Sequence, residues 1–152
     1  MKTEFRKASV PKELRSLMAF DRRIFPASDC FDAEYWRECE AWWLLAGGVK
    51  IGCCAFEAVP GAKPGGARQS LYIGTTGILP KYRGMGFGRL MKAWEVAYAR
   101  FHGYRRLAAH TREGNAAMIA LNRRFGFRIV RRTPGYYSEP AEAAVFMELR
   151  LK

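Results

Sequence analysis

The residues best suited to hold a ligand lie near the middle of the chain, where an arginine is followed by three glycines. The segment Arg83–Arg89 reads R-G-M-G-F-G-R and falls between a predicted strand and a predicted helix. The first turn of a helix has backbone N–H groups without internal partners, and the helix dipole adds positive potential there. Glycines let a phosphate approach those amides closely. The turn therefore predicts a pyrophosphate cradle, and a glycine-rich connection without a ligand is the alternative.

Two common nucleotide-binding motifs do not fit this turn. The P-loop requires G-x-x-x-x-G-K-[ST], and no such string is present in the sequence. The dinucleotide fingerprint requires G-x-G-x-x-G, whereas the spacing here is G-x-G-x-G. That fingerprint also usually opens a fold, whereas this turn lies past the midpoint of the chain. The turn is therefore typical of neither class.

Positive charge is concentrated around the same segment. The chain carries 26 Lys and Arg against 14 Asp and Glu, a formal net charge of +12. Residues 81–132 hold 13 of these basic residues and two acids, Glu95 and Glu113. Such a segment attracts polyanions, namely nucleic acid, an acidic membrane or a phosphate-rich cofactor. A solvated basic face that only aids solubility is the alternative.

A strand and a helix must position the glycine-rich turn. The pattern predicts a strand over Ser70–Leu79, stopped by Pro80, and a helix over Gly88–Phe101. Glycine inside a strand often marks a bulge or a close backbone approach, as expected for Gly74 and Gly77. The predicted apolar face of the helix comprises Leu90, Trp94, Ala97 and Phe101, with Lys92, Glu95 and Arg100 elsewhere.

The remaining elements complete an α+β fold with a mixed sheet, helices on both faces and a strand–turn–helix unit at its centre. We expect one domain over residues 1–152 and a loop over Pro60–Gly66. The other predicted strands are Thr3–Ser9, Trp42–Ala46, Ile51–Val59, Arg105–His110, Phe127–Arg131 and Ala144–Leu151. The other predicted helices open at Pro11 and cover Asp32–Glu40, capped by Asp32, and Asn115–Phe125.

The bulk features indicate a cytoplasmic protein. No apolar run reaches the ~18 residues of a membrane span, and the first residues lack an apolar signal region. The cysteines form no CxxC pair and stand far from both histidines, so we expect reduced thiols and no metal site. They are Cys30, Cys39, Cys53 and Cys54.

Two motifs resemble those of a known family. Arg83-x-x-Gly86-x-Gly88, preceded by Pro80, resembles the R/Q-x-x-G-x-G/A pyrophosphate loop of the GNAT superfamily of N-acetyltransferases. The segment from Asn115 to Phe127 resembles that family's N-x-x-A-x-x-L-Y-x-x-x-G-F string. The resemblance covers roughly residues 70–132 and extends weakly to both ends. It implies a mostly antiparallel central sheet with a splayed strand pair that forms a slot for acetyl-CoA as cosubstrate.

The resemblance also implies which residues bind acetyl-CoA. Backbone amides from Met85 to Arg89 would hold the pyrophosphate. The strand end at Ile78 and Leu79 would pair with the pantetheine arm, and a backbone N–H there would serve the oxyanion. Asn115 would hydrogen-bond the pantetheine. The complete implied set is Ile78, Leu79, Arg83, Gly84, Met85, Gly86, Phe87, Gly88, Arg89 and Asn115.

His110 occupies the position of a strand glutamate in the ribosomal-protein alanine acetyltransferases of this superfamily, five residues before Asn115. A free imidazole has a pKa of ~6.5, so it is largely neutral at pH 7 and can accept a proton. The resemblance therefore makes His110 a candidate general base. A histidine that only hydrogen-bonds within its strand is the alternative, and Glu113 is a second candidate base.

The sequence departs from the family where a general acid is expected. Asn122 replaces the usual tyrosine, and an amide can hydrogen-bond a thiolate but cannot donate a titrating proton. Tyr136 and Tyr137 could substitute for it, or they could pack or contact substrate. The catalytic candidates are thus His110, Asn122, Tyr136 and Tyr137. A covalent route through Cys53 or Cys54 is disfavoured because buried strand cysteines are usually inert.

The tail of the chain bears on the acceptor. Arg131-Arg132 followed by Tyr136-Tyr137 looks like the R-R-x-Y-Y tail of the ribosomal-protein alanine acetyltransferases, with Pro134 and Gly135 inserted. This favours a protein or peptide α-amine, including that of a ribosomal protein, as acceptor. The alternatives are a small-molecule amine, an acetyl-CoA-binding module without turnover, and a nucleic-acid-binding protein.

Overall fold

The computed structural model describes residues 1–58 and 69–151, so the predicted loop Pro60–Gly66 and Val59 lie outside the described residues. Its strands are β1 Thr3–Lys7, β2 Glu40–Ala46, β3 Val49–Ala58, β4 Ser70–Ile78, β5 Arg106–Arg112, β6 Arg128–Ser138 and β7 Ala141–Arg150. Its α-helices are α1 Leu14–Ile24, α2 Ala33–Glu38, α3 Phe87–Phe101 and α4 Ala116–Arg124. No helix in this described part is long and apolar enough to cross a membrane.

The strands follow the order β1-β2-β3-β4-β5-β7-β6. The β1–β2, β2–β3, β5–β7 and β6–β7 pairs are antiparallel, and β4 pairs with β5 in parallel. This confirms the expected α+β class with a mixed, mostly antiparallel sheet.

The chain divides into two compact units that share β4. The first comprises Met1–Glu57 and Gly74–Gly88. The second contains, among the described residues, Ala58, residues 69–73 and residues 89–151. Residues 83–88 of the glycine-rich turn therefore belong to the first unit, and Arg89 and the predicted catalytic side chains belong to the second.

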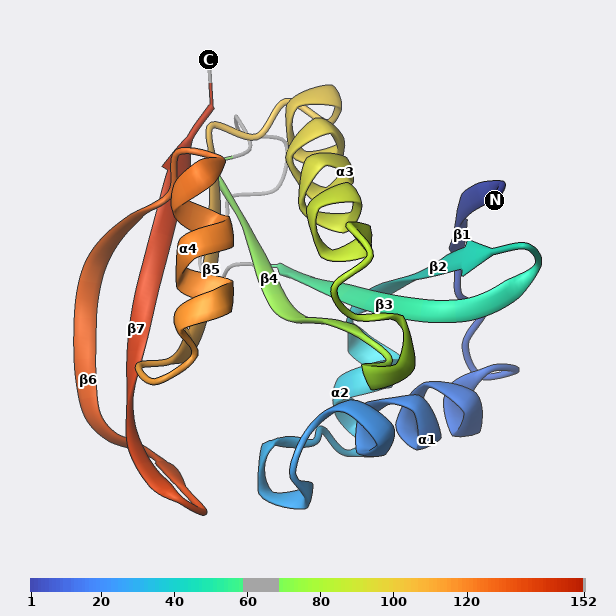
Figure 1. Cartoon of the computed structure of the whole chain (residues 1–152), viewed down its shortest axis with the longest axis horizontal. Helices are drawn as coiled ribbons and strands as arrows, with labels where there is room; N and C mark the ends of the chain where they lie inside the picture. Colours follow the sequence, from blue (N-terminus) through green and yellow to red (C-terminus); the bar gives the residue numbers. More distant parts are fainter. Residues whose placement is uncertain (59–68, 152) are drawn as a thin grey trace. The chain divides into compact units, whose positions relative to one another are not determined.

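The first unit is a layer of antiparallel strands covered by α1 and α2, which lie side by side in Figure 1. Its core brings together Phe20 of α1, Trp36 of α2 and Trp43 of β2. The rings of Phe20 and Trp43 meet edge to face with centroids 5.3 Å apart, a favoured aromatic geometry. Leu79, at the end of β4, is buried in the same core. The start of the glycine-rich turn is therefore anchored in a packed core.

In the second unit, α4 covers one face of β5 and β7 (Figure 1). Leu107, Ala109 and Met147 are buried, and the side-chain amide of Asn122 on α4 donates to the Sδ of Met147 at 3.5 Å. Alternate residues of a strand point to opposite faces. His110 and Phe146, which are register partners, therefore lie on the other face, where both are half-buried.

The predicted apolar face of α3 is wrong. Leu90 is 37% exposed and Phe101 is 86% exposed, whereas Met91, Lys92 and Glu95 are buried. The Lys92 ammonium lies 3.0 Å from the Glu95 carboxylate and 5.3 Å from the centroid of the Phe127 ring. Burial of a charged residue is tolerated where an opposite charge compensates it. Because the two opposite charges compensate each other, α3 can bury the face that contains Lys92 and Glu95.

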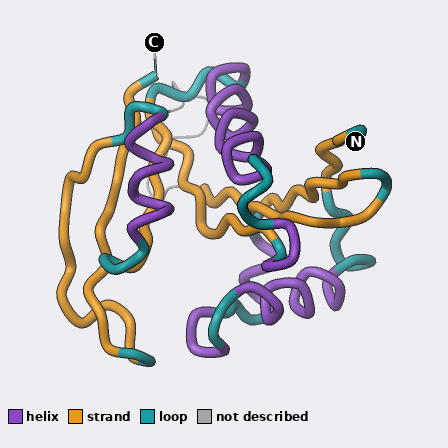
Figure 2. Tube along the Cα trace, in the orientation of Figure 1, coloured by secondary structure: helices purple, strands orange, loops and turns teal. Residues whose placement is uncertain are grey.

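The closing hairpin is longer than the predicted strands Phe127–Arg131 and Ala144–Leu151. Figure 2 shows β6 and β7 as long strands running side by side to a short turn. Pro134 and Gly135 lie in β6, where the register shifts between Thr133 and Tyr137. Proline and glycine are tolerated at a bulge of an edge strand. The sequence therefore suggested a loop where the structure has an irregular strand.

The helix boundaries follow local signals with small differences. The side chain of Asp32 accepts the backbone N–H of Tyr35 at 2.9 Å, which confirms the predicted cap of α2. The first helix begins at Leu14 and not at Pro11. Ser9 accepts the amide of Glu13 at 2.6 Å, and the Glu13 carboxylate accepts the amide of Ser9 in return. These two bonds close a turn around Pro11 and delay the helix.

Candidate functional site

The glycine-rich turn follows a backbone path that favours glycine. A short 3₁₀ turn, Pro80–Tyr82, leads into it, and α3 begins at Phe87. Gly84 and Gly86 have φ angles of +76° and +89°, which side chains other than glycine rarely adopt. A Cβ built at either position would meet no atom within 4 Å. Glycine is therefore needed at these positions for its backbone conformation and not because a side chain would clash. The space beside the turn is open at the N-terminus of a 15-residue helix.

The strand end before the turn is already partly engaged. The Leu79 amide donates to the carbonyl oxygen of Ile51 at 2.9 Å, so it is committed to the sheet. The Nε of Arg83 donates to the carbonyl oxygen of Ile78 at 3.1 Å. Of the two amides expected to serve an oxyanion, that of Leu79 is therefore already bonded, and the role of the Ile78 amide stays a prediction. The arginine closes the turn onto β4, in addition to any contact with an anion.

The predicted close approach at Gly74 is confirmed. A Cβ built there would lie 1.7 Å from the Tyr35 hydroxyl and 2.2 Å from the Glu57 Oε2. These two groups form a hydrogen bond of 2.8 Å, in which the phenol donates. Burial and the neighbouring Glu57 carboxylate raise the pKa of Tyr35, which keeps the phenol protonated. Gly74 is therefore required by space, because any side chain would displace this pair.

His110 lies at the centre of an aromatic cluster on the half-buried face of the second unit. Its ring centroid is 5.1 Å from those of Tyr136 and Phe146 and 6.3 Å from that of Tyr137. The structure thus brings together three of the four predicted catalytic residues, His110, Tyr136 and Tyr137. We call His110, Tyr72, Tyr136, Tyr137 and Phe146 the His110 cluster.

Tyr72 is the member of this cluster that the sequence analysis missed. Its hydroxyl forms a short hydrogen bond with Nδ1 of His110, and the two ring centroids lie 5.7 Å apart. Tyr72 pairs in register with Ala108, two residues before His110, through the parallel β4–β5 ladder. The signal in the sequence was strand alternation, because Tyr72 lies between the buried residues Leu71 and Ile73 and therefore on the opposite face of β4. The register that joins the strands is not visible in the sequence.

Burial lowers the pKa of His110 from its ordinary value of 6.5. The imidazole is therefore neutral at pH 7, with one ring nitrogen protonated and the other able to accept a proton. A hydrogen bond at Nδ1 selects the tautomer. If Nδ1–H donates to the Tyr72 oxygen, Nε2 carries the free lone pair. The cluster can then act as a general base.

Glu113 does not share these properties. Its carboxylate is exposed and accepts two hydrogen bonds from the Arg132 guanidinium, one of them 3.1 Å long. Hydrogen bonding from Arg132 lowers the pKa of Glu113 further. A carboxylate with a lowered pKa is a weak base at neutral pH, so His110 is the better candidate.

The two asparagines of the second motif have structural partners. The side-chain oxygen of Asn115 caps α4 by accepting the Met118 amide at 3.2 Å, which leaves its NH₂ group for a ligand. Asn122 is buried under α4 against Met147, on the face opposite the His110 cluster. The structure therefore does not bring Asn122 together with the other catalytic candidates, and we give it no part in the chemistry proposed below.

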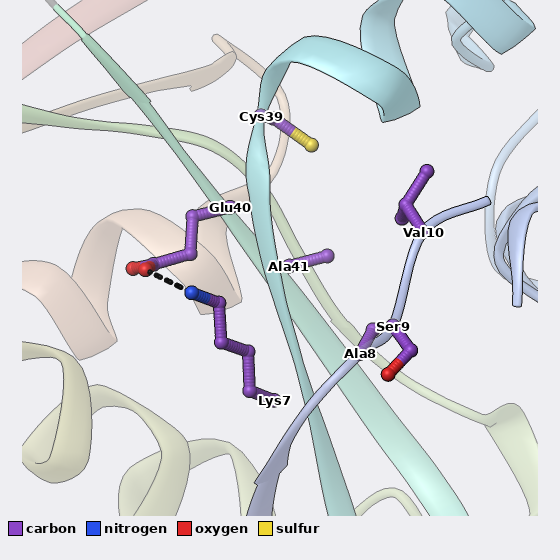
Figure 3. A pocket seen from close by; sticks show the side chains of 7 residues that line it. All are labelled: Lys7, Ala8, Ser9, Val10, Cys39, Glu40 and Ala41. Atoms are coloured by element: carbon purple, nitrogen blue, oxygen red, sulfur yellow. Dashed lines mark ion pairs between the residues drawn. The ribbon is translucent and has the colours of Figure 1, made fainter. Parts of the chain in front are cut away.

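The first unit has a separate pocket of about 370 Å³ where β1 ends and β2 begins. Figure 3 shows Lys7 and Glu40 pointing toward one another at its wall, where their charged groups are 3.0 Å apart. Burial raises the pKa of the Cys39 thiol in this wall to about 12. Burial also raises the pKa of Cys53, which supports the expectation that these thiols are unreactive. None of the predicted site residues lines the pocket.

The sequence profile of the acetyltransferase (GNAT) family matches residues 12–127. No curated protein sequence matches the chain.

Several solved structures share the fold at low sequence identity. The ribosomal-protein-S18-alanine N-acetyltransferase from Escherichia coli aligns with a TM-score of 0.83 and 17% identity, over 99% of this chain and 95% of that chain. Arabidopsis thaliana NAA60 in complex with acetyl-CoA gives a TM-score of 0.80 and 21% identity, over 99% of both chains. The IAA acetyltransferase from Bacillus cereus ATCC 14579 gives 0.77 and 17%, over 99% of this chain and 100% of that chain.

Proposed function

Because the chain belongs to the acetyltransferase (GNAT) family, we propose that it transfers an acetyl group from acetyl-CoA directly to the N-terminal α-amine of a protein or peptide. The observation that carries the proposal is the His110 cluster, in which a neutral imidazole is held by a tyrosine hydroxyl and walled by aromatic rings. This cluster supplies a base matched to a weakly basic amine.

Acetyl-CoA is the cosubstrate that the glycine-rich turn fits. The NAA60 structure from Arabidopsis thaliana holds acetyl-CoA. In this chain, the open backbone at Gly84 and Gly86 and the first turn of α3 would offer amides to a pyrophosphate. The NH₂ group of Asn115 would contact the pantetheine arm, and the amide of Ile78 would serve the oxyanion. Arg83 and Arg89 add positive charge beside the same turn.

The chain's own residues would move one proton in the reaction. The acceptor amine must be neutral to attack the thioester carbonyl, and it gains positive charge as the new N–C bond forms. His110 takes the proton from that nitrogen at Nε2, while Tyr72 fixes Nδ1. The electron pair of the carbonyl returns as the C–S bond breaks, and coenzyme A leaves as a thiolate. Because the coenzyme A thiol is fairly acidic, its thiolate is a good leaving group and needs no enzymic acid to protonate it as it departs.

The strength of this base supports an α-amine as the acceptor. An α-amine has a pKa of ~7.7–8.0, so a tenth or more is neutral at pH 7, whereas a lysine side chain at ~10.4 is almost wholly charged. A histidine whose pKa is lowered suits the former. The tyrosines of β6 could contact the peptide backbone, and the basic second half of the chain disfavours polycationic acceptors.

We therefore expect kcat/KM for a peptide with a free N-terminal alanine to exceed that for its N-blocked, lysine-containing twin by at least tenfold. Spermidine should be no better than the blocked peptide. The assay follows release of the coenzyme A thiol under identical conditions. A clear preference for the blocked peptide or for spermidine would show that the α-amine proposal is wrong, and would leave the acetyltransferase assignment intact. Small-molecule amines belong in the same panel, because one of the similar solved structures is an IAA acetyltransferase.

Removing the Tyr72 hydroxyl tests how the base is held. Tyr72→Phe keeps the ring and deletes the hydrogen bond to Nδ1 of His110. A hydrogen bond to a group that becomes charged contributes ~1.5–3 kcal/mol, so kcat should fall by about tenfold or more. Tyr136→Phe is the matched control, because its ring also contacts His110 without a hydrogen bond to it. Equal effects of the two substitutions would contradict the positioning role of Tyr72.

A further inference from the structure

Four arginines from three strands share one end of the face that carries His110. We call Arg106 of β5, Arg128 and Arg131 of β6, and Arg150 of β7 the arginine face. All four are exposed. They belong to a single unit of the chain, so their placement relative to one another and to His110 is fixed by strand pairing.

The register shows that these side chains point the same way as His110. Arg106 lies four residues before His110 on β5 and is the partner of Arg150 on β7. Residues at even spacing on a strand share a face, and cross-strand partners do too. Arg131 is the partner of Phe146, and its guanidinium lies 4.1 Å from the centroid of that ring. Since Phe146 walls the His110 cluster, the arginine face begins beside it.

The face has a strong excess of positive charge. One acid interrupts it, Glu148, which is the register partner of Arg128 and forms an ion pair of 3.5 Å with Arg106. Exposed pairs of this kind are weak. Four arginines against one glutamate leave a surface that attracts anions. Arginine also binds carboxylates with two parallel hydrogen bonds, which adds geometric selectivity.

We propose that the arginine face binds acidic side chains of the acceptor, a few residues beyond the acetylated amine. The proposal rests on the proposed function, because it takes the α-amine to lie at His110. A strand rises ~3.3 Å per residue, so Arg106 is about 13 Å from His110 along β5. An extended peptide leaving His110 in this direction would place its third to fifth residues over the arginines. Acceptors with Asp or Glu at those positions would therefore be preferred.

The test compares three peptides that begin with the same two residues and carry Asp, Asn or Lys at positions three to five. We expect kcat/KM to fall in that order, with the acidic peptide at least tenfold better than the neutral one at low ionic strength. The advantage should shrink in 0.5 M salt, which screens exposed charges. Equal values for the acidic and neutral peptides would overturn the proposal.

A charge-removing variant locates the effect. Arg106→Gln/Arg128→Gln/Arg150→Gln leaves Arg131 on its aromatic partner and should abolish the acidic preference, with kcat for the neutral peptide unchanged. The control is Arg123→Gln/Arg124→Gln, which removes exposed arginines from α4, on the opposite face, and should keep the preference. Loss of the preference in the control variant would contradict the placement.

Two other outcomes are distinguishable. If no N-terminal peptide is acetylated by the parent protein, the proposed function fails before the arginine face is tested. The other outcome is that the parent protein binds a single-stranded RNA of ~10 nucleotides, that the triple variant binds it more weakly, and that no preference for acidic peptides is seen. In that case the face recognises phosphate and the acidic-acceptor proposal is wrong. Arginine pairs with both anions, and the position beside His110 favours the acceptor.

Discussion

Replacing His110 with alanine is expected to lower kcat by about 10² or more, the usual scale for the loss of a general base. The reason is the neutral imidazole at the centre of the His110 cluster, whose pKa is lowered by burial. Affinity for acetyl-CoA should stay within twofold of the parent value, because His110 is not one of the groups proposed to bind it. Turnover is measured by thiol release, and affinity by calorimetry.

The pH dependence supplies a second readout for the same variant. A histidine with a lowered pKa remains a base below pH 6.5 and loses activity only as the pH falls through that lowered value. The same shift makes the folded state lose stability below pH 6.5, because the unfolded chain then binds the proton more readily. His110→Ala should show neither effect. If this variant keeps the parent's rate and the parent's loss of activity at low pH, another group is the base.

Replacing Gly86 with aspartate is expected to weaken acetyl-CoA binding by at least tenfold, or about 1.4 kcal/mol. The substitution places a negative charge beside the proposed pyrophosphate site and forces a side chain onto a φ of +89°. Both effects act beside the N-terminus of α3, where a Cβ built at Gly86 meets no atom within 4 Å. Calorimetric titration with acetyl-CoA gives the affinity directly.

Gly48→Asp separates the specific effect from backbone strain. Gly48 lies in the turn between β2 and β3 with a φ of +80°, and a Cβ there also meets nothing within 4 Å. The substitution therefore adds the same charge and comparable strain at a site that no cofactor is expected to touch. Normal affinity in a folded Gly86→Asp protein, or an equal loss in both variants, would contradict the cradle.

The elements that depend on local chemistry were predicted well. The helix after the glycine-rich turn was expected from Gly88 and begins at Phe87, and Asp32 caps α2 as its residue type indicated. Such features are set by a few neighbouring residues, whose backbone preferences act over one turn. The motif residues were found for the same reason, since their spacing is a property of a single segment.

The features that depend on distant pairing were not predicted. Tyr72 joins His110 because β4 runs parallel to β5, and the sequence gives no sign of that register. Asn122 was proposed for the chemistry from its motif position, but packing turns it toward Met147. Its side-chain oxygen is buried without a hydrogen-bond partner among the described residues. Pairing partners and helix rotation are settled by the whole core, which local patterns do not describe.

The buried pair in α3 restricts how this chain can change over evolution. Lys92 and Glu95 are 1% and 0% exposed, and their charges lie 3.0 Å apart. Loss of either partner alone would strand a charge in the interior, whereas a simultaneous apolar replacement of both can be neutral or stabilising. Single mutations that lead from the charged pair to an apolar pair therefore pass through a destabilised intermediate with one unpaired buried charge. The two positions should therefore be inherited as a linked pair, and their joint replacement would mark a separate branch of descent.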